Sequence, residues 1–168
     1  MASSSLGSGI RRVISALFST RTSPSPRADT STGHGGTSGT VEVDPRGMRA
    51  VSLSYAPTPN GQPDPGEIVW TWVPYEENDG RGKDRPVVIV ATAPSGFLAV
   101  QLTSKHHDGA DYLSLGAGPW DREGRPSWVI LDRVFRVSTA GVRREASRLD
   151  RKRFEQVASA LRSRYGWR

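Results

Sequence analysis

The sequence predicts a mainly β fold, a small antiparallel barrel or half-barrel with a C-terminal helix. Three observations lead to this prediction. Short apolar stretches of strand length recur between residues 66 and 137, turn residues separate them, and 149–167 carries apolar residues at helical spacing. Several short antiparallel strands followed by one helix are typical of a small barrel that the helix caps.

The predicted strands differ in pattern. GEIVWTWVP (66–74) alternates between two faces, with Trp70 expected in the core. RPVVIVATA (85–93) is a continuous apolar run, as expected for a strand that is covered on both sides. Three more strands are predicted downstream: FLAVQLTS (97–104), DYLSLG (111–116) and SWVILDRVFRV (127–137).

The predicted helix lies in LDRKRFEQVASALRSRYGW (149–167). Asp150 is a suitable N-cap, and Gly166 is a suitable stop. The apolar residues that recur at helical spacing are Phe154, Val157, Ala158 and Leu161.

Charge is distributed unevenly along the 168 residues, whose formal net charge is +6. Residues 143–168 hold nine Arg or Lys against three acids, whereas 66–142 hold eight against ten. A basic end favours an acidic partner such as nucleic acid, a membrane surface or an acidic peptide. A solvated Arg-rich helix explains the same charge. The absence of cysteine excludes disulfides and thiolate chemistry.

The composition divides the chain into a low-complexity extension and linker, 1–60, and a barrel domain, 61–168. The stretch 20–40 is Ser, Thr, Pro and Gly with almost no apolar residue, which predicts disorder. MRAVSLSYA (48–56) is a candidate edge strand in the linker. We expect removal of residues 1–60 to leave fold and activity intact.

Targeting signals are weak in this sequence. IRRVISALF (10–18) is too short and too broken for a secretory signal. No apolar run is long enough to span a bilayer. We therefore expect a cytoplasmic protein without a membrane partner.

Four segments carry a family resemblance. GEIVW (66–70), RPVVIV (85–90), LTS (102–104) and WVILD (128–132) are similar, in order and spacing, to segments of the MazF/PemK (Kid) family, the ribonuclease toxins of bacterial type II toxin–antitoxin pairs. The resemblance covers roughly 66–164. It implies an SH3-like barrel, usually a homodimer, that cuts single-stranded RNA through 2′-OH attack without a metal or other cofactor. It also implies a small inhibitory antitoxin, which can mediate DNA binding of the complex.

Arg85 and Thr103 match the catalytic residues of the family. A guanidinium is always charged and can grip two phosphate oxygens at once, which suits a developing phosphorane. Arg85 could instead close the preceding loop by pairing with Asp84 or Asp79. Thr103, with Ser104 beside it, offers a hydroxyl to the scissile phosphate, although Thr is also common on half-buried sheet faces.

Asp132 matches the acidic position of the family's late strand, where it would act in proton transfer or base recognition. It could equally be an outward-facing strand residue next to Arg133. Some family members place an Arg two residues before this acid, whereas this chain has Ile130 there.

Further residues are expected to contact RNA, largely from the charged loop before Arg85, which would be a mobile flap. Trp120 is the best candidate for stacking on an unpaired base. The adjacent His106 and His107 would point to opposite faces of a strand, so we expect no metal site. The expected RNA contacts are Glu76, Glu77, Asp79, Arg81, Lys83, Lys105, His106 and Trp120.

An alternative interpretation uses the same barrel as a non-catalytic module that binds nucleic acid or protein, because a fold does not fix a function.

Overall fold

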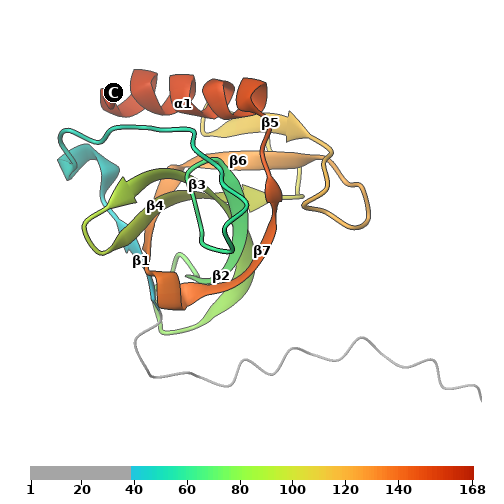
Figure 1. Ribbon diagram of the computed structural model, residues 1–168, viewed down its shortest axis with the longest axis horizontal. Helices are drawn as coiled ribbons and strands as arrows, with labels where there is room; N and C mark the ends of the chain where they lie inside the picture. The colour runs from blue at the N-terminus through green and yellow to red at the C-terminus, as the bar shows by residue number, and fades with distance from the viewer. Residues whose placement is uncertain (1–38) are drawn as a thin grey trace, which may run out of the picture. The chain divides into compact units, whose positions relative to one another are not determined.

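The computed structural model describes residues 39–168. Within them, seven strands form one curled antiparallel sheet that helix α1 (Arg151–Tyr165) covers on one side (Figure 1). This confirms the predicted fold class. Two single-turn 3-10 helices, η1 (Pro45–Gly47) and η2 (Thr139–Gly141), follow β1 and β6. The strands are β1 (Thr40–Val43), β2 (Glu67–Pro74), β3 (Gly82–Ala93), β4 (Gly96–Thr103), β5 (Tyr112–Gly116), β6 (Ser127–Val137) and β7 (Val142–Arg148).

Backbone ladders join the strands in the order β1-β6-β4-β3-β2-β7, and β5 pairs with β6. In the described chain, this path does not join β1 to β2, although the curl of the sheet brings them close together. Side chains bridge this β1–β2 seam instead. The Thr71 hydroxyl donates to the carbonyl of Gly141 at 2.7 Å and is also bonded to the Thr40 hydroxyl.

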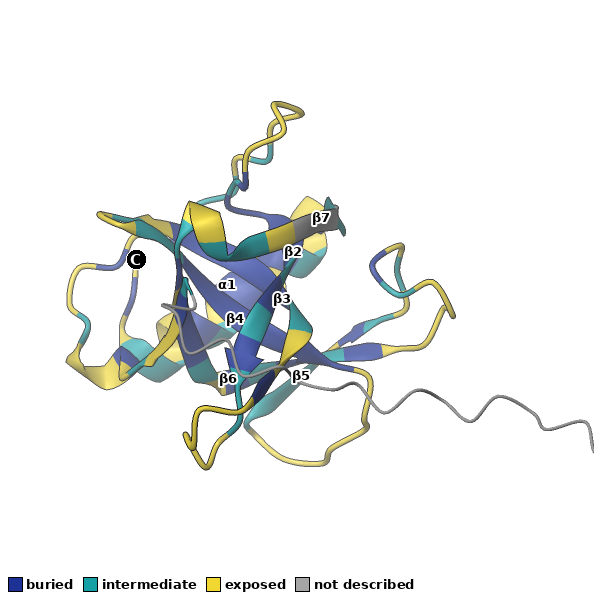
Figure 2. Cartoon of the chain, turned by 90° about the horizontal axis from the view of Figure 1, so that it is seen from below, coloured by how far each residue is buried: buried dark blue, intermediate teal, exposed yellow. Residues whose placement is uncertain are grey.

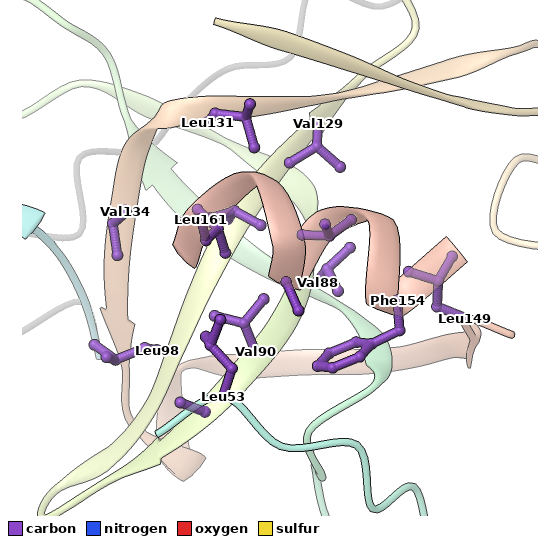
Figure 3. Packing of buried hydrophobic residues seen from close by; sticks show 14 of the residues in the cluster. Leu53, Val88, Val90, Leu98, Val129, Leu131, Val134, Leu149, Phe154 and Leu161 are labelled. Atoms are coloured by element: carbon purple, nitrogen blue, oxygen red, sulfur yellow. The ribbon is translucent and has the colours of Figure 1, made fainter. Parts of the chain in front are cut away.

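Both sides of the sheet are packed with apolar residues. On β3, Val88 and Val90 face the cluster under the helix, which includes Phe154 and Leu161 (Figure 3). Residues of opposite parity, such as Ile89, belong to a second cluster on the other side of the sheet. This two-sided burial explains why 85–93 is an unbroken apolar run, as predicted. Figure 2 shows the dark core strands between exposed loops.

The sequence located most of these elements. All five predicted strands are present, and Ser127–Val137 matches its predicted bounds. The helix is capped as predicted, with Asp150 accepting from the backbone N–H of Arg153 and Gly166 in the left-handed region at φ 70°. Strand β7 was not predicted, because VRREASR has no apolar alternation.

The predicted domain boundary at residue 60 is too late. Strand β1 pairs with β6 along its whole length, and Val51 and Leu53 are buried in the core under the helix. The 48–56 segment is not a strand of the sheet. It is fixed by backbone bonds from Leu53 N–H to the carbonyl of Arg168 and from Arg168 N–H to the carbonyl of Val51.

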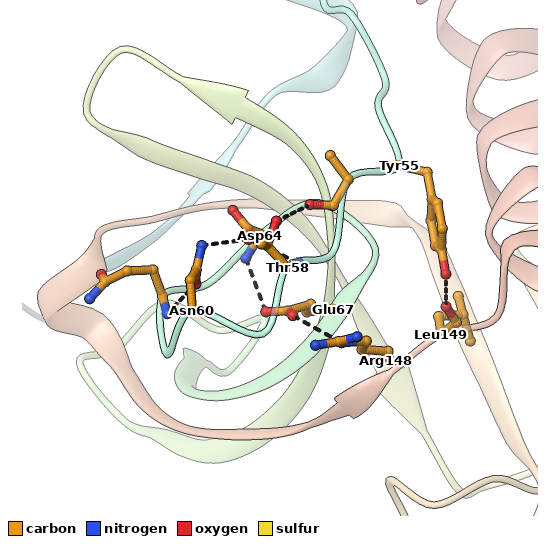
Figure 4. A network of polar contacts seen from close by, with 9 residues as sticks. Tyr55, Thr58, Asn60, Asp64, Glu67, Arg148 and Leu149 are labelled. Atoms are coloured by element: carbon orange, nitrogen blue, oxygen red, sulfur yellow. Dashed lines mark hydrogen bonds and ion pairs between the residues drawn. The ribbon is translucent and has the colours of Figure 1, made fainter.

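A buried carboxylate orders the linker before β2 (Figure 4). Glu67 is fully buried and accepts a bond from Asp64 N–H at 3.1 Å. Its other oxygen lies 3.6 Å from Arg148 Nε on the neighbouring strand β7. Tyr55 adds a second tie by donating to the carbonyl of Leu149. A buried charge needs such partners, so these contacts fix the linker against β7.

Replacing Asp150 with alanine should lower the free energy of unfolding by about 1 kcal/mol through loss of the N-cap. The Arg153 backbone N–H and then its guanidinium hold the pKa of Asp150 below its usual value. This stabilisation is therefore fully present above about pH 3.9 and is lost as pH falls through the lower folded-state pKa. Urea denaturation across pH measures both effects. Asp150→Asn should keep the cap and lose the pH dependence.

A chain that begins at residue 61 should melt at a markedly lower temperature than one that begins at residue 39. The shorter chain loses β1 and the buried Val51 and Leu53. Removing two buried aliphatic side chains alone costs several kcal/mol, about 1.5–3 kcal/mol each. Equal melting temperatures by circular dichroism would show that residues 39–60 add nothing to the fold.

Candidate functional site

Arg85 and Thr103 meet where β3 begins and β4 ends. The antiparallel ladder between β3 and β4 ends at the pair Val87↔Gln101, and Arg85 and Thr103 each lie two residues beyond this pair. Two surface hollows flank this pair, a larger one of about 550 Å³ and a smaller one of about 310 Å³. Both residues line both hollows. The pair therefore stands at the centre of one continuous concave surface.

The Arg85 guanidinium makes no ion pair with any described carboxylate. The two acids that could have closed the loop around it have other partners. Asp79 pairs with Arg81 at 2.6 Å, and Asp84 lies 3.7 Å from Arg143 Nε. Because Arg85 is half-buried and unpaired, its charge is available to an anion in either hollow.

Thr103 presents its hydroxyl at the edge between the hollows and is only 8 % exposed. Its Oγ1 accepts a bond from Lys105 N–H at 3.1 Å, which turns the chain at the end of β4. The hydroxyl proton is left to donate elsewhere. The next residue, Ser104, is exposed and lines the smaller hollow.

The flap loop, residues 75–81, forms one wall of the larger hollow. Of the predicted RNA contacts, Glu76, Glu77 and Arg81 line this hollow, as does Lys105 from the opposite side. Sequence reasoning missed several other lining residues, for which only the aromatic, polar or charged residue type gave a signal. These are Tyr75, Gln101, His107, Tyr112 and Arg133.

The predicted role of Trp120 as an exposed stacking platform is wrong. Trp120 is only 5 % exposed, and its indole N–H donates to the Ser127 hydroxyl at 3.0 Å. The Arg153 guanidinium lies 5.4 Å from its ring centroid. The indole buries its large apolar surface and satisfies its N–H, so it forms the floor of the smaller hollow. Lys83, another expected RNA contact, also lines this hollow.

The rim of the smaller hollow is a charged turn. Asp121 pairs with Arg125 at 2.9 Å and also accepts a bond from Glu123 N–H. Although burial acts in the opposite direction, the Glu123 N–H and the Arg125 guanidinium hold the pKa of Asp121 below its usual value. The Asp121 carboxylate thus stays ionised and fixes the turn.

Three predicted site residues line neither hollow. Asp79 is engaged by Arg81. His106 packs beside Trp128 with ring centroids 5.1 Å apart, whereas His107 lines the larger hollow. Asp132 is exposed outside the hollows.

A bulge explains the position of Asp132. The β4–β6 register shifts between the pairs Gln101↔Ile130 and Val100↔Val134. A bulge changes which side later residues face. Ile130 and Arg133, rather than Ile130 and Asp132, therefore line the larger hollow.

Residues 39–168 contain no group of three or more His, Cys, Asp or Glu side chains placed to hold a metal ion. Over the same residues, no helix is long and apolar enough to cross a membrane.

Solved structures with this fold include two toxins at low sequence identity. MazF (Form-I) from Deinococcus radiodurans is 20% identical with a TM-score of 0.52, over 62% of this chain and 97% of that one. An endoribonuclease in complex with its cognate antitoxin from Mycobacterial species is 15% identical with a TM-score of 0.50, over 62% of this chain and 95% of that one. At such identities these matches establish the fold alone. No curated protein sequence matches the chain.

Family membership comes from the sequence profile of the PemK-like, MazF-like toxin of type II toxin-antitoxin system, which matches residues 64–164. The match spans more than half of the chain, from the start of the β2 region to the last turn of α1. The chain therefore belongs to the PemK-like, MazF-like toxin family of type II toxin–antitoxin systems.

Proposed function

We propose that this protein is an endoribonuclease that cleaves single-stranded RNA by attack of a ribose 2′-hydroxyl on the adjacent phosphorus. The observation that carries the proposal is the unpaired Arg85 guanidinium opposite the Thr103 hydroxyl, with a hollow on either side. With a phosphate bound at Arg85 and Thr103, the nucleotides on its two sides would each occupy one of the two hollows. The hollow volumes suit this arrangement, since ligand pockets usually begin at about 300 Å³.

The residues divide the chemistry among them. Arg85 holds the phosphate and takes up the charge that develops on its oxygens. Thr103 donates its hydroxyl to a phosphate oxygen, and Ser104 adds a second hydroxyl beside it. The carboxylates of the larger hollow, Glu76 and Glu77, accept the 2′-hydroxyl proton as general base. The O2′–P bond forms, the P–O5′ bond breaks, and the 5′ oxygen takes up a proton. A cyclic phosphate remains, and no metal or other cofactor takes part.

The same surface suits an inhibitory partner. Three accessible cations, Arg81, Arg85 and Lys105, line the larger hollow together with two carboxylates. An antitoxin segment with acidic side chains would compete with RNA for these cations. We also expect a homodimer, as the family resemblance implies.

Replacing Arg85 with alanine should lower the cleavage rate at least about 100-fold, because one preorganised group that stabilises developing charge typically contributes a rate factor of this size. The test incubates the chain with a long single-stranded RNA in EDTA and locates cuts by primer extension. Arg136→Ala is the matched control, since Arg136 is an exposed arginine on β6 outside both hollows. An Arg85→Ala variant that cuts as fast as the parent would refute the site. Intact RNA with a salt-sensitive gel shift in the parent would indicate a binding module instead.

Thr103→Val should slow single-turnover cleavage by about 10- to 100-fold, because one hydrogen-bond donor to the phosphate is lost while the side-chain shape is kept. Thr103→Ser retains a hydroxyl and should stay near the parent rate. If the valine variant cleaves like the parent, Thr103 is an ordinary strand residue.

A further inference from the structure

Arg133 is a largely buried cation on β6 to which the proposed reaction assigns no role. Only 11 % of its side chain is exposed, although it lies on β6 beside the larger hollow. The β6 bulge turns Arg133 to this side of the sheet and leaves Asp132 exposed. The guanidinium also packs over the Phe135 ring, 5.1 Å from its centroid, so its apolar stem and plane cover one core cluster.

The guanidinium bonds three other strands. Its Nε and Nη2 donate to the two carboxylate oxygens of Glu42 on β1, at 3.0 and 2.6 Å. Nη2 also donates to the carbonyl of Pro74 on β2 at 2.9 Å. Nη1 lies 3.5 Å from the Gln101 oxygen on β4. Arg133 thus closes the β1–β2 seam from β6, at the end of the sheet where the flap loop begins.

These bonds decide between two roles for Arg133. A guanidinium has five N–H groups, and the bonds to Glu42, Pro74 and Gln101 use four of them. Burial lowers the pKa of Arg133, but Glu42 and the charge of Glu76 outweigh it and raise the pKa above the usual arginine value. Only one N–H is left, so the group is a cation held mainly by protein oxygens, which suits it to fixing its neighbours more than to gripping a substrate phosphate.

Two of the bonded neighbours connect Arg133 to the site. Pro74 is the last residue of β2, and the flap loop with Glu76 and Glu77 starts directly after it. Gln101 lines the larger hollow two residues before Thr103 on the same strand. Glu42 lies on β1, which precedes the family-matched residues 64–164.

We infer that Arg133 is a positioning residue that Glu42 orients, and that together they hold the base of the flap loop in place over the larger hollow. The inference rests on the proposed function, because the flap carries the carboxylates assigned as general base. It gives β1, a strand outside the family-matched segment, a part in the reaction.

The test compares full-length Arg133→Met, Arg133→Lys and Glu42→Gln with the parent and with the control Arg136→Met. We expect Arg133→Met to lower kcat for a short RNA substrate by about 10- to 100-fold, as expected for a misplaced reacting group, while KM changes by less than about twofold. Arg133→Lys should not restore the rate, because one ammonium cannot span Glu42, Pro74 and Gln101 at once. Combining Glu42→Gln with Arg133→Met should lower the rate no further than Arg133→Met alone.

Amide hydrogen exchange supplies a readout that needs no cleavage. The Tyr75 N–H bonds to the carbonyl of Arg81, and the Asn78 N–H bonds to the carbonyl of Tyr75. In Arg133→Met and Glu42→Gln both amides should exchange at least about tenfold faster, as expected for local opening of a loop, while the core amide of Val88 stays protected.

Several outcomes would overturn the inference. A rise in KM with unchanged kcat would make Arg133 a direct substrate contact. Unchanged exchange at Tyr75 and Asn78 would show that Arg133 does not order the flap, and parallel loss of protection at Val88 would reduce its role to fold stability. If the parent cleaves no RNA, the proposed function fails, and the exchange comparison alone decides whether Arg133 and Glu42 order the flap.

Discussion

The structure depends on closing a curled sheet where its backbone ladders stop. Main-chain bonds cannot join β1 to β2 along the ladder path of the described strands, so side chains take over. Thr40 and Thr71 do this beside Gly141, and Arg133 does it between Glu42 and Pro74. A buried polar group that loses its hydrogen-bond partner costs the full desolvation penalty. These side-chain bonds therefore tolerate little displacement of the strands that they join. Both ties therefore fix how β2 stands against the rest of the sheet.

The centre of the site is a product of a single hairpin. Arg85 and Thr103 lie on β3 and β4, which a short turn connects, and the antiparallel pairing of these strands brings both residues to the same two hollows. The walls of the two hollows come from segments that lie further away in the sequence. The flap loop follows β2, and the charged turn around Asp121 precedes β6. Arg85 and Thr103 thus come from one hairpin, while the walls around them are assembled by the whole sheet.

This division also explains what the sequence could predict. Arg85 and Thr103 were singled out by the family resemblance. Strands with strong apolar patterns and the two helix caps follow from periodicity and local motifs. The bulge in β6 follows from neither, because residues 131–133 have no partner on β4 and change which side Asp132 and Arg133 face, without any sign in the residue types. Strand β7 is polar, so apolar periodicity did not predict it. Trp120 is buried by tertiary packing, which the sequence of a loop does not reveal.

Because the two hollows share only Arg85 and Thr103, a substitution in the wall of one hollow can leave the other hollow unchanged. Arg85 and Thr103 belong to both hollows, whereas the flap loop borders one and the turn at 121–125 borders the other. Substitutions in either loop can reshape one hollow without moving the hairpin that carries the pair. A lineage that keeps Arg85 and Thr103 can therefore change the shape and charge of the two hollows independently, one loop at a time.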